Sequence, residues 1–346
     1  MKIVLEVFSM KLTFQPYNLN LKHTFSIANF SRTSTPIVLT QIEHNGIVGY
    51  GEASLPQYLG ETQESVCAFL QKVNLSEFDI QDDMDKIMQS IDAIDKNNTA
   101  AKASIDIALY DLKGKFFNRS VREMLNITAK NTPFTSYTIG IDSEQIIRQK
   151  VKEATPYTIL KIKVNRENWK EIVDIIRTET QKPLFIDANQ SWICKEEALE
   201  NIHYLSTKNV LLIEQPLEKH NISDHRWLSQ RSPLPIIADE SVQRLSDLEL
   251  IKDAFNGINI KLMKCTGINE AYKMILSARK YGLKVMLGCM TETSCAISAA
   301  AQLSPLVDFA DLDGNLLITN DCFRGVEIAE GRILLNNKNG IGVDKI

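Results

Sequence analysis

Three carboxylates in the second half of the chain have the types and the spacing expected of a metal site. Asp187, Glu214 and Asp239 each close a short apolar run, and neighbouring runs lie roughly 25 residues apart, about one strand–helix unit. Carboxylate oxygens are hard ligands that suit Mg²⁺ or Mn²⁺. No His or Cys stands at these three run ends, which disfavours zinc.

Lysines end two further apolar runs, where a buried strand would ordinarily carry Val, Ile or Leu. Lys161 and Lys163 end the run ILKIK, and Lys261 ends the run GINIK. If these runs are the second and sixth strands of one closed barrel, their lysines face each other across its mouth. A substrate held on the metal would then lie between two amines. Lys264, three residues further on, is expected to lie outside the chemistry.

Two aspartates close the last apolar run. Asp311 and Asp313 are two residues apart, so their side chains point to the same side of a strand. Because the metal ligands are already accounted for, this second pair of carboxylates suits a cationic group such as an ammonium. A second metal site and a solvated turn are the alternatives. Thr135, in the first run, is a further candidate for substrate contact.

The elements that must position these residues are short strands alternating with helices. Eight apolar runs from residue 134 onward are separated by amphipathic stretches: FTSYTIG, TILKIKV, PLFIDA, VLLIEQP, PIIADE, GINIKL, LKVMLG and VDFADLD. The pattern predicts an α/β fold, a (β/α)8 TIM-type barrel, with an open doubly wound sheet as the alternative. In a barrel all strand ends gather at one mouth. No glycine-rich nucleotide-binding motif follows any of the runs.

The first third of the chain has a different texture. Residues 1–60 are β-rich, with a hairpin signal at Asn45-Gly46, and residues 61–125 have helical periodicity. Strands followed by helices predict a separate α+β domain.

Composition excludes several classes of protein. The 346 residues carry 39 Lys and Arg against 43 Asp and Glu, a net charge of −4, which disfavours nucleic acid and anionic membranes as partners. No apolar run reaches the roughly 18 residues that span a bilayer, and the N-terminus does not resemble a signal peptide. Six scattered cysteines without a CxxC pair predict reduced thiols and a cytoplasmic location.

In order and spacing, these motifs resemble the enolase superfamily, in its muconate-lactonizing subgroup. GYGEAS (49–54) resembles the capping-domain signature, and the lysine and metal strands match in LKIKV, DANQSW, IEQPL, ADES and NIKLMKCTGI. The resemblance implies an N-terminal capping domain over 1–124 and a modified barrel over 125–320. It also implies a C-terminal segment, 321–346, that packs back on the capping domain.

The resemblance implies a reaction as well. Mg²⁺, with Mn²⁺ as a substitute, would bind Asp187, Glu214 and Asp239 and stabilise an enediolate. Lys163 would be the base on one face and Lys261 the acid or base on the other, with Lys161 neutralising the substrate carboxylate. Their pKa should be lowered by the neighbouring positive charge. Racemisation, epimerisation, syn-elimination and cycloisomerisation all remain open to such a pair.

The last two aspartates narrow the substrate. Asp311-Leu312-Asp313 is similar to the Asp-x-Asp motif of dipeptide epimerases, which holds the ammonium of a dipeptide; L-Ala-D/L-Glu, from murein breakdown, is a frequent substrate. The implied enzyme is an isomerase with a small dipeptide substrate, and it is a candidate homo-oligomer. The alternatives are o-succinylbenzoate synthase, N-acylamino acid racemase or muconate cycloisomerase, a non-catalytic barrel, and a Schiff-base aldolase.

A glutamate side chain needs a cation in the pocket. In the family an Arg in the loop between the first two strands provides it, and that position aligns here with Asn29 or Phe30. Arg32 follows closely and could supply the charge, whereas Phe30 would favour an apolar side chain.

Overall fold

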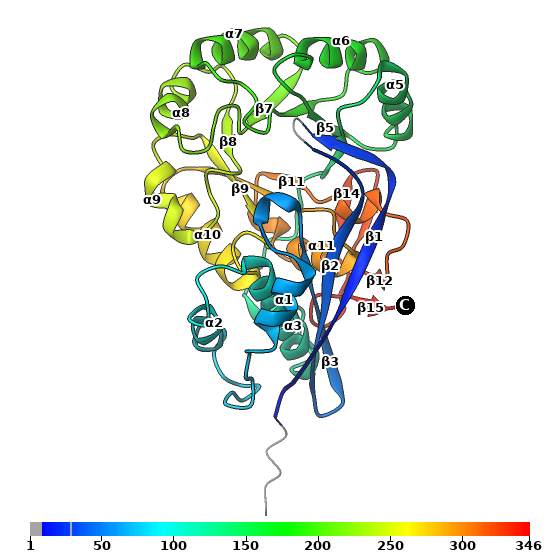
Figure 1. The fold of residues 1–346 in the computed structure, drawn as a ribbon, viewed down its shortest axis with the longest axis vertical. Helices are drawn as coiled ribbons and strands as arrows, with labels where there is room; N and C mark the ends of the chain where they lie inside the picture. The colour runs from blue at the N-terminus through cyan, green and yellow to red at the C-terminus, as the bar shows by residue number, and fades with distance from the viewer. Residues whose placement is uncertain (1–8, 28–29) are drawn as a thin grey trace, which may run out of the picture.

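An N-terminal sheet and helices lie beside a parallel barrel in the computed structural model, which describes residues 9–27 and 30–346 (Figure 1). The sheet is antiparallel, in the order β1 (Lys11–Ile27), β2 (Phe30–His44) and β3 (Ile47–Ser54). The hairpin signal is confirmed, because Asn45 and Gly46 join β2 to β3 with φ of 52° and 76°. The helices are α1 (Gln63–Leu70), α2 (Met84–Asp92), α3 (Thr99–Phe116) and α4 (Val121–Met124).

Glycines of β3 let α3 lie directly against the sheet. A β-carbon on Gly51 would stand 1.9 Å from the Ser104 carbonyl oxygen, and one on Gly49 would stand 2.1 Å from the Ala108 carbonyl oxygen. Backbone at such distances leaves no room for a side chain. The two glycines of the GYGEAS segment therefore fix the distance between α3 and β3.

Eight parallel strands form the barrel, and each is hydrogen-bonded to the next in chain order. A bridge between Thr135 and Ala310 brings the first and last strands together. The predicted barrel is therefore confirmed over the open sheet. The strands are β4 (Ser136–Ile139), β5 (Ile159–Lys163), β6 (Leu184–Asp187), β7 (Val210–Glu214), β8 (Ile236–Ala238), β9 (Gly257–Lys261), β10 (Lys284–Gly288) and β11 (Phe309–Asp311).

Helices follow the first seven strands. They are α5 (Glu144–Glu153), α6 (Trp169–Glu179), α7 (Lys195–Ser206), α8 (Ile222–Ser229), α9 (Leu248–Ile251), α10 (Ile268–Lys280) and α11 (Ser294–Ala301). After β11 the chain makes a 3-10 turn, Gly314–Leu317, in place of an eighth α-helix. The residues beyond it lack helical periodicity and continue as short strands.

The C-terminal strands return to the N-terminal elements. β12 (Phe323–Arg324) pairs with β15 (Asp344–Lys345), and β13 (Glu327–Ala329) pairs with β14 (Arg332–Leu334). The Ile341 N–H donates to Asp111 of α3 at 3.0 Å, and the rings of Phe323 and Tyr50 lie 5.4 Å apart. The end of the chain thus packs against α3 and β3.

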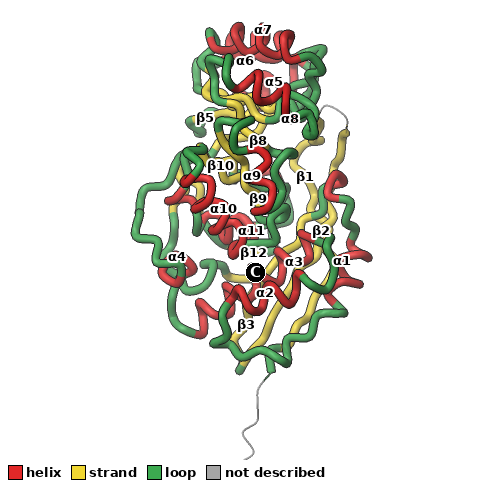
Figure 2. Tube along the Cα trace, turned by 90° about the vertical axis from the view of Figure 1, so that its left-hand side faces the viewer, coloured by secondary structure: helices red, strands yellow, loops and turns green. Residues whose placement is uncertain are grey.

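The β1–β2 ribbon runs from the N-terminal domain to the barrel (Figure 2). Asn320, beyond the 3-10 turn, clamps β1: its side chain accepts from Asn20 N–H at 2.7 Å and donates to the Asn18 carbonyl at 2.9 Å. Leu21 also forms a bridge with Ile318. These contacts hold the ribbon beside the end of the last barrel strand.

No helix in the described ranges is both long enough and apolar enough to cross a membrane.

Candidate active site

Side chains on the inner face of the barrel change from apolar to charged along several of the strands. A small core of Phe185, Leu212, Ile237 and Met286 fills the interior. Two residues beyond the first three of these, on the same face, stand Asp187, Glu214 and Asp239. The apolar layer therefore forms a floor, and the charged layer lies above it at the mouth.

Three carboxylates meet at this mouth as the spacing predicts. Oxygens of Asp187, Glu214 and Asp239 lie within 4.8 Å of one another, and all three side chains are buried. A group of hard oxygen ligands from neighbouring strand ends suits a divalent cation such as Mg²⁺.

One oxygen of each carboxylate is held by a neighbouring donor. The Asn189 N–H donates to Asp187 Oδ1 at 3.0 Å, Asn259 Nδ2 donates to Glu214 Oε1 at 2.8 Å, and Lys264 Nζ donates to Asp239 Oδ1 at 2.5 Å. These contacts fix the three side chains and leave their second oxygens toward one another. This donor set therefore fits a bound metal ion, and the partners of its outer oxygens orient it.

The second oxygens contact the cavity lysines. Lys161 Nζ lies 3.1 Å from Asp187 and 2.8 Å from Glu214, and Lys163 Nζ lies 2.5 Å from Asp187. Lys261 Nζ lies 2.7 Å from Asp239. These contacts balance the negative charge that the barrel gathers at its mouth.

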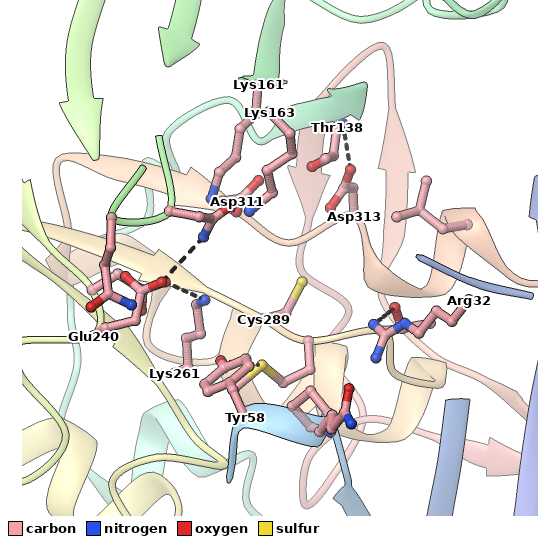
Figure 3. A pocket seen from close by; sticks show the side chains of 18 residues that line it. Arg32, Tyr58, Thr138, Lys161, Lys163, Glu240, Lys261, Cys289, Asp311 and Asp313 are labelled. Carbon is pink, nitrogen blue, oxygen red and sulfur yellow. Dashed lines mark hydrogen bonds and ion pairs between the residues drawn. The ribbon is translucent and has the colours of Figure 1, made fainter. Parts of the chain in front are cut away.

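The two predicted catalytic lysines come from opposite sides of the barrel. Lys163 stands on β5 and Lys261 on β9, four strands apart in an eight-stranded ring. Figure 3 shows them reaching into the same cavity from different walls. A substrate between them would present one face to each amine.

The surrounding carboxylates stabilise the protonated lysines. Burial alone would lower the pKa of Lys161, but Asp311 and Glu214 outweigh burial and hold that pKa well above its ordinary value. Burial and Asp239 oppose each other in the same way at Lys261, whose pKa is also held well above its ordinary value. The expected lowering of the lysine pKa therefore requires a cation on the carboxylates to offset their charge.

Asp311 and Asp313 both reach the cavity (Figure 3). Asp311 accepts from Ser136 Oγ and from Lys161 Nζ, both at 2.7 Å. Asp313 accepts from the Thr138 N–H at 2.6 Å. Burial and the neighbouring Asp311 raise the pKa of Asp313 to about 7. The Asp311–Asp313 pair thus lies near the group of three carboxylates, as predicted, but Asp311 is already paired with Lys161.

Other predicted contacts lie differently. Thr135 accepts from the Leu312 N–H at 2.6 Å across the closing strands, and it is Thr138 that lines the cavity. Arg32 lines the cavity, and its Nη2 donates to Thr291 Oγ1 at 2.9 Å. Phe30 begins β2, but its side chain lies outside the described part of the structure.

The cavity has a volume of about 370 Å³, within the range of small-molecule sites. Residues 56–58, after β3, and residues 289–291, after β10, form further walls of the cavity. A wall from the N-terminal domain thus completes a cavity whose floor belongs to the barrel.

Several supporting residues were not predicted from the sequence. Lys264 does not line the cavity, which agrees with its expected place outside the chemistry. It nevertheless contacts Asp239 and so supports that carboxylate, which the sequence did not predict. Gln215, with a φ of 38°, accepts from the Asp239 N–H at 2.9 Å and joins the ends of β7 and β8. A signal for Asn259 existed, since it stands two residues before Lys261 on the same strand face.

The chain matches known families and proteins over most of its length. Residues 10–126 match the family described as "Mandelate racemase / muconate lactonizing enzyme, N-terminal domain", and residues 144–345 match "Enolase C-terminal domain-like". The L-Ala-D/L-Glu epimerase of Bacteroides thetaiotaomicron is 53% identical over 338 residues, which cover 97% of this chain and 88% of that protein.

Solved structures share the fold. A substrate-liganded L-Ala-D/L-Glu epimerase from Bacillus subtilis superposes with a TM-score of 0.91 at 26% identity, covering 97% of this chain and 99% of that one. A dipeptide epimerase from Enterococcus faecalis, complexed with Mg and L-Leu-L-Tyr, has a TM-score of 0.88 at 32% identity and the same coverage.

The carboxylate cluster predicts stabilisation by magnesium. We expect Mg²⁺ to raise the melting temperature in a concentration-dependent way, because a ligand at 100 times its Kd stabilises the native state by about 2.7 kcal/mol. Glu214→Gln should reduce this shift strongly. The measurement is thermal unfolding across a Mg²⁺ titration, with Glu200→Gln, an exposed glutamate on α7, as the control. An equal shift in Glu214→Gln and the wild type would contradict the assignment.

Proposed function

The chain belongs to the mandelate racemase and muconate lactonizing enzyme family of the enolase superfamily, and we propose that it is a Mg²⁺-dependent dipeptide epimerase. The observation that carries the proposal is the presence, in one cavity, of the Asp311–Asp313 pair, the opposed lysines and Asp239, whose carboxylate clusters with those of Asp187 and Glu214. The 53% identity to an L-Ala-D/L-Glu epimerase supports it.

Each end of a dipeptide finds a complementary group. Asp187, Glu214 and Asp239 would hold Mg²⁺, which when bound supplies Lewis-acid stabilisation of negative charge developing on the substrate carboxylate. Lys161, already shared among three carboxylates, adds positive charge at that end. The substrate ammonium would meet Asp311 and Asp313 and would take over part of the charge that Asp311 now shares with Lys161.

Opposed lysines account for inversion of the α-carbon. Lys163 takes the α-proton from one face, and Lys261 delivers a proton to the opposite face; the reverse reaction exchanges the two roles. For this exchange one amine must be neutral while the other is protonated.

Arg32 is the cation that we propose for a glutamate side chain at the inverted residue. It is partly buried, lines the cavity and is oriented by Thr291. L-Ala-D/L-Glu is therefore the dipeptide that we propose as substrate.

Other activities of the same subgroup are not favoured. The substrates of o-succinylbenzoate synthase, N-acylamino acid racemase and muconate cycloisomerase carry no free ammonium, so they leave Asp313 without a purpose in the cavity. A Schiff-base aldolase has no use for three clustered carboxylates beside its lysine.

The cellular setting follows from the substrate. A dipeptide from murein breakdown would be processed in the cytoplasm, where the six cysteines, all free in the structure, remain reduced.

The proton-transfer roles predict solvent exchange. In D₂O with Mg²⁺, the wild type should introduce one deuterium at the α-carbon of L-Ala-L-Glu, as read by mass spectrometry. Lys163→Ala and Lys261→Ala should each abolish epimerisation, with turnover reduced at least about 1,000-fold, as expected when an essential acid or base is removed. Lys150→Ala, at a buried lysine of α5, is the control. Full turnover in the Lys163→Ala or the Lys261→Ala variant would contradict the mechanism.

The Asp313 carboxyl predicts a pH dependence. Its pKa is raised to about 7, so the ionised form that binds an ammonium gains population as the pH rises through 7. KM for the dipeptide should therefore fall several-fold between pH 6 and 7.5 at saturating Mg²⁺. Asp313→Asn should raise KM and remove the dependence. A wild-type KM that stays flat over this range would contradict the assignment.

Arg32 predicts the side-chain preference. Arg32→Met should lower kcat/KM for L-Ala-L-Glu by about 100-fold, because a hydrogen bond between charged groups contributes about 1.5–3 kcal/mol. The value for L-Ala-L-Met should change less than about threefold, since that side chain carries no charge. Lys22→Met, an exposed cation of β1, is the matched control. Equal losses on both dipeptides would refute the specific role.

A further inference from the structure

The GYGEAS segment carries a buried carboxylate that the proposed reaction does not use. Glu52 stands on β3 and is fully buried. Its Oε1 accepts from the Thr293 N–H at 3.0 Å, and its Oε2 accepts from the Thr293 hydroxyl. A carboxylate of the N-terminal domain therefore binds both donors of one residue in the barrel.

Thr293 occupies a special place in the barrel. It is the N-cap of α11, and its side chain accepts from the Cys295 N–H at 3.1 Å. The residues just before it, 289–291, line the cavity. We call residues 289–293 the β10–α11 wall. Glu52 thus fixes the end of this wall at the point where it enters a helix.

Two further contacts hold the same wall. Ser54, two residues beyond Glu52 on β3, donates to the Thr291 carbonyl at 2.7 Å. Inside the wall, Glu292 accepts from the Met290 N–H at 3.0 Å. The wall therefore has one hydrogen-bonded contact within itself, at Glu292, and is bonded to β3 through both Glu52 and Ser54.

The wall in turn orients Arg32, whose Nη2 donates to Thr291 Oγ1. Movement of the wall would thus move the hydroxyl that directs this guanidinium. Glu52 is thus connected to Arg32 by hydrogen bonds at Thr293 and at Thr291 and by the short stretch of chain between these two residues.

Burial and hydrogen bonding have opposite effects on the charge of Glu52. Burial raises the pKa of Glu52 to about 7, against the lowering effect of the Thr293 hydrogen bonds. The unpaired N–H groups at the start of a helix favour an acceptor that carries negative charge. A neutral amide would lose this attraction and would also turn an N–H₂ group toward a donor.

We propose that Glu52 is a positioning residue for substrate recognition, which holds the β10–α11 wall and thereby Arg32 against the side chain of the inverted residue. The proposal rests on the proposed function for its substrate. It assigns to the N-terminal domain a defined part in selectivity, while the proton transfer stays with the barrel.

The test is Glu52→Gln, which keeps size and removes charge. KM for L-Ala-L-Glu should rise at least about tenfold while kcat changes less than about threefold, because the lysines are untouched. The preference for L-Ala-L-Glu over L-Ala-L-Met should fall by a similar factor. The Mg²⁺-induced shift in melting temperature should stay at its wild-type size, and amide hydrogen exchange over 287–295 should accelerate.

Ser54→Ala is a second variant, which removes a single hydroxyl. We expect it to change KM, the dipeptide preference and the exchange rates in the same direction as Glu52→Gln, but by a smaller amount. Glu43→Gln, an exposed glutamate on β2, is the control. In the double variant Glu52→Gln/Thr293→Val, the loss of preference for L-Ala-L-Glu, expressed as a free energy, should be smaller than the sum of the losses in the two single variants. The reason is that both substitutions break the same contact.

The outcomes separate the two proposals. A wild type that epimerises no dipeptide overturns the proposed function, whatever the exchange data show. An active wild type whose Glu52→Gln variant keeps its KM, its selectivity and its exchange rates overturns the positioning role. Equal losses in kcat, in KM and in the Mg²⁺ response would also overturn it, since they indicate a general structural role.

Discussion

Negative charge gathered inside the barrel is the constraint on which the rest of the structure depends. Asp187, Glu214 and Asp239 are buried with their oxygens within 4.8 Å of one another. Like charges at such distances repel, and burial removes the water that would screen them. The cluster persists because Lys161 and Lys261 lie against it, and because a barrel brings strand ends to one height. Charge balance, and not apolar burial, decides which side chains stand at this level.

The same constraint explains the support around the cluster. Asn259 and Lys264 hold one oxygen of Glu214 and Asp239 respectively, so the second oxygens cannot turn away from each other to relieve the repulsion. A site held in this way is already arranged for a divalent cation, and little reorganisation is needed when one binds. In the proposed function, the lysines that balance the carboxylates before binding are then the amines nearest to the substrate carboxylate. One set of contacts therefore serves both stability and chemistry.

The periodicity of the sequence predicted this carboxylate cluster because the geometry of the cluster depends on local strand structure. A strand places every second residue on one face, and parallel strands of similar length end together, so the spacing of Asp187, Glu214 and Asp239 was sufficient. The contact of Lys264 with Asp239 could not be predicted, because it depends on how the chain turns after β9. The contact of Glu52 with Thr293 joins residues 241 positions apart, and no periodicity encodes that pairing. Likewise, the missing eighth helix depends on where the C-terminal strands pack.

Positions set by the strand period and positions set by contacts between distant segments serve different purposes in the molecule. Positions dictated by strand period carry charge that any substrate of this family must meet, and they belong to the barrel alone. Positions dictated by contact between distant segments, such as Glu52 and Arg32, hold the wall that, in the proposed function, faces the variable part of the substrate. In the proposed function, substitutions on the N-terminal domain can therefore alter which side chain is accepted while the carboxylates and lysines keep their places on the barrel strands. Selectivity can change through packing while the charged floor of the barrel stays as it is.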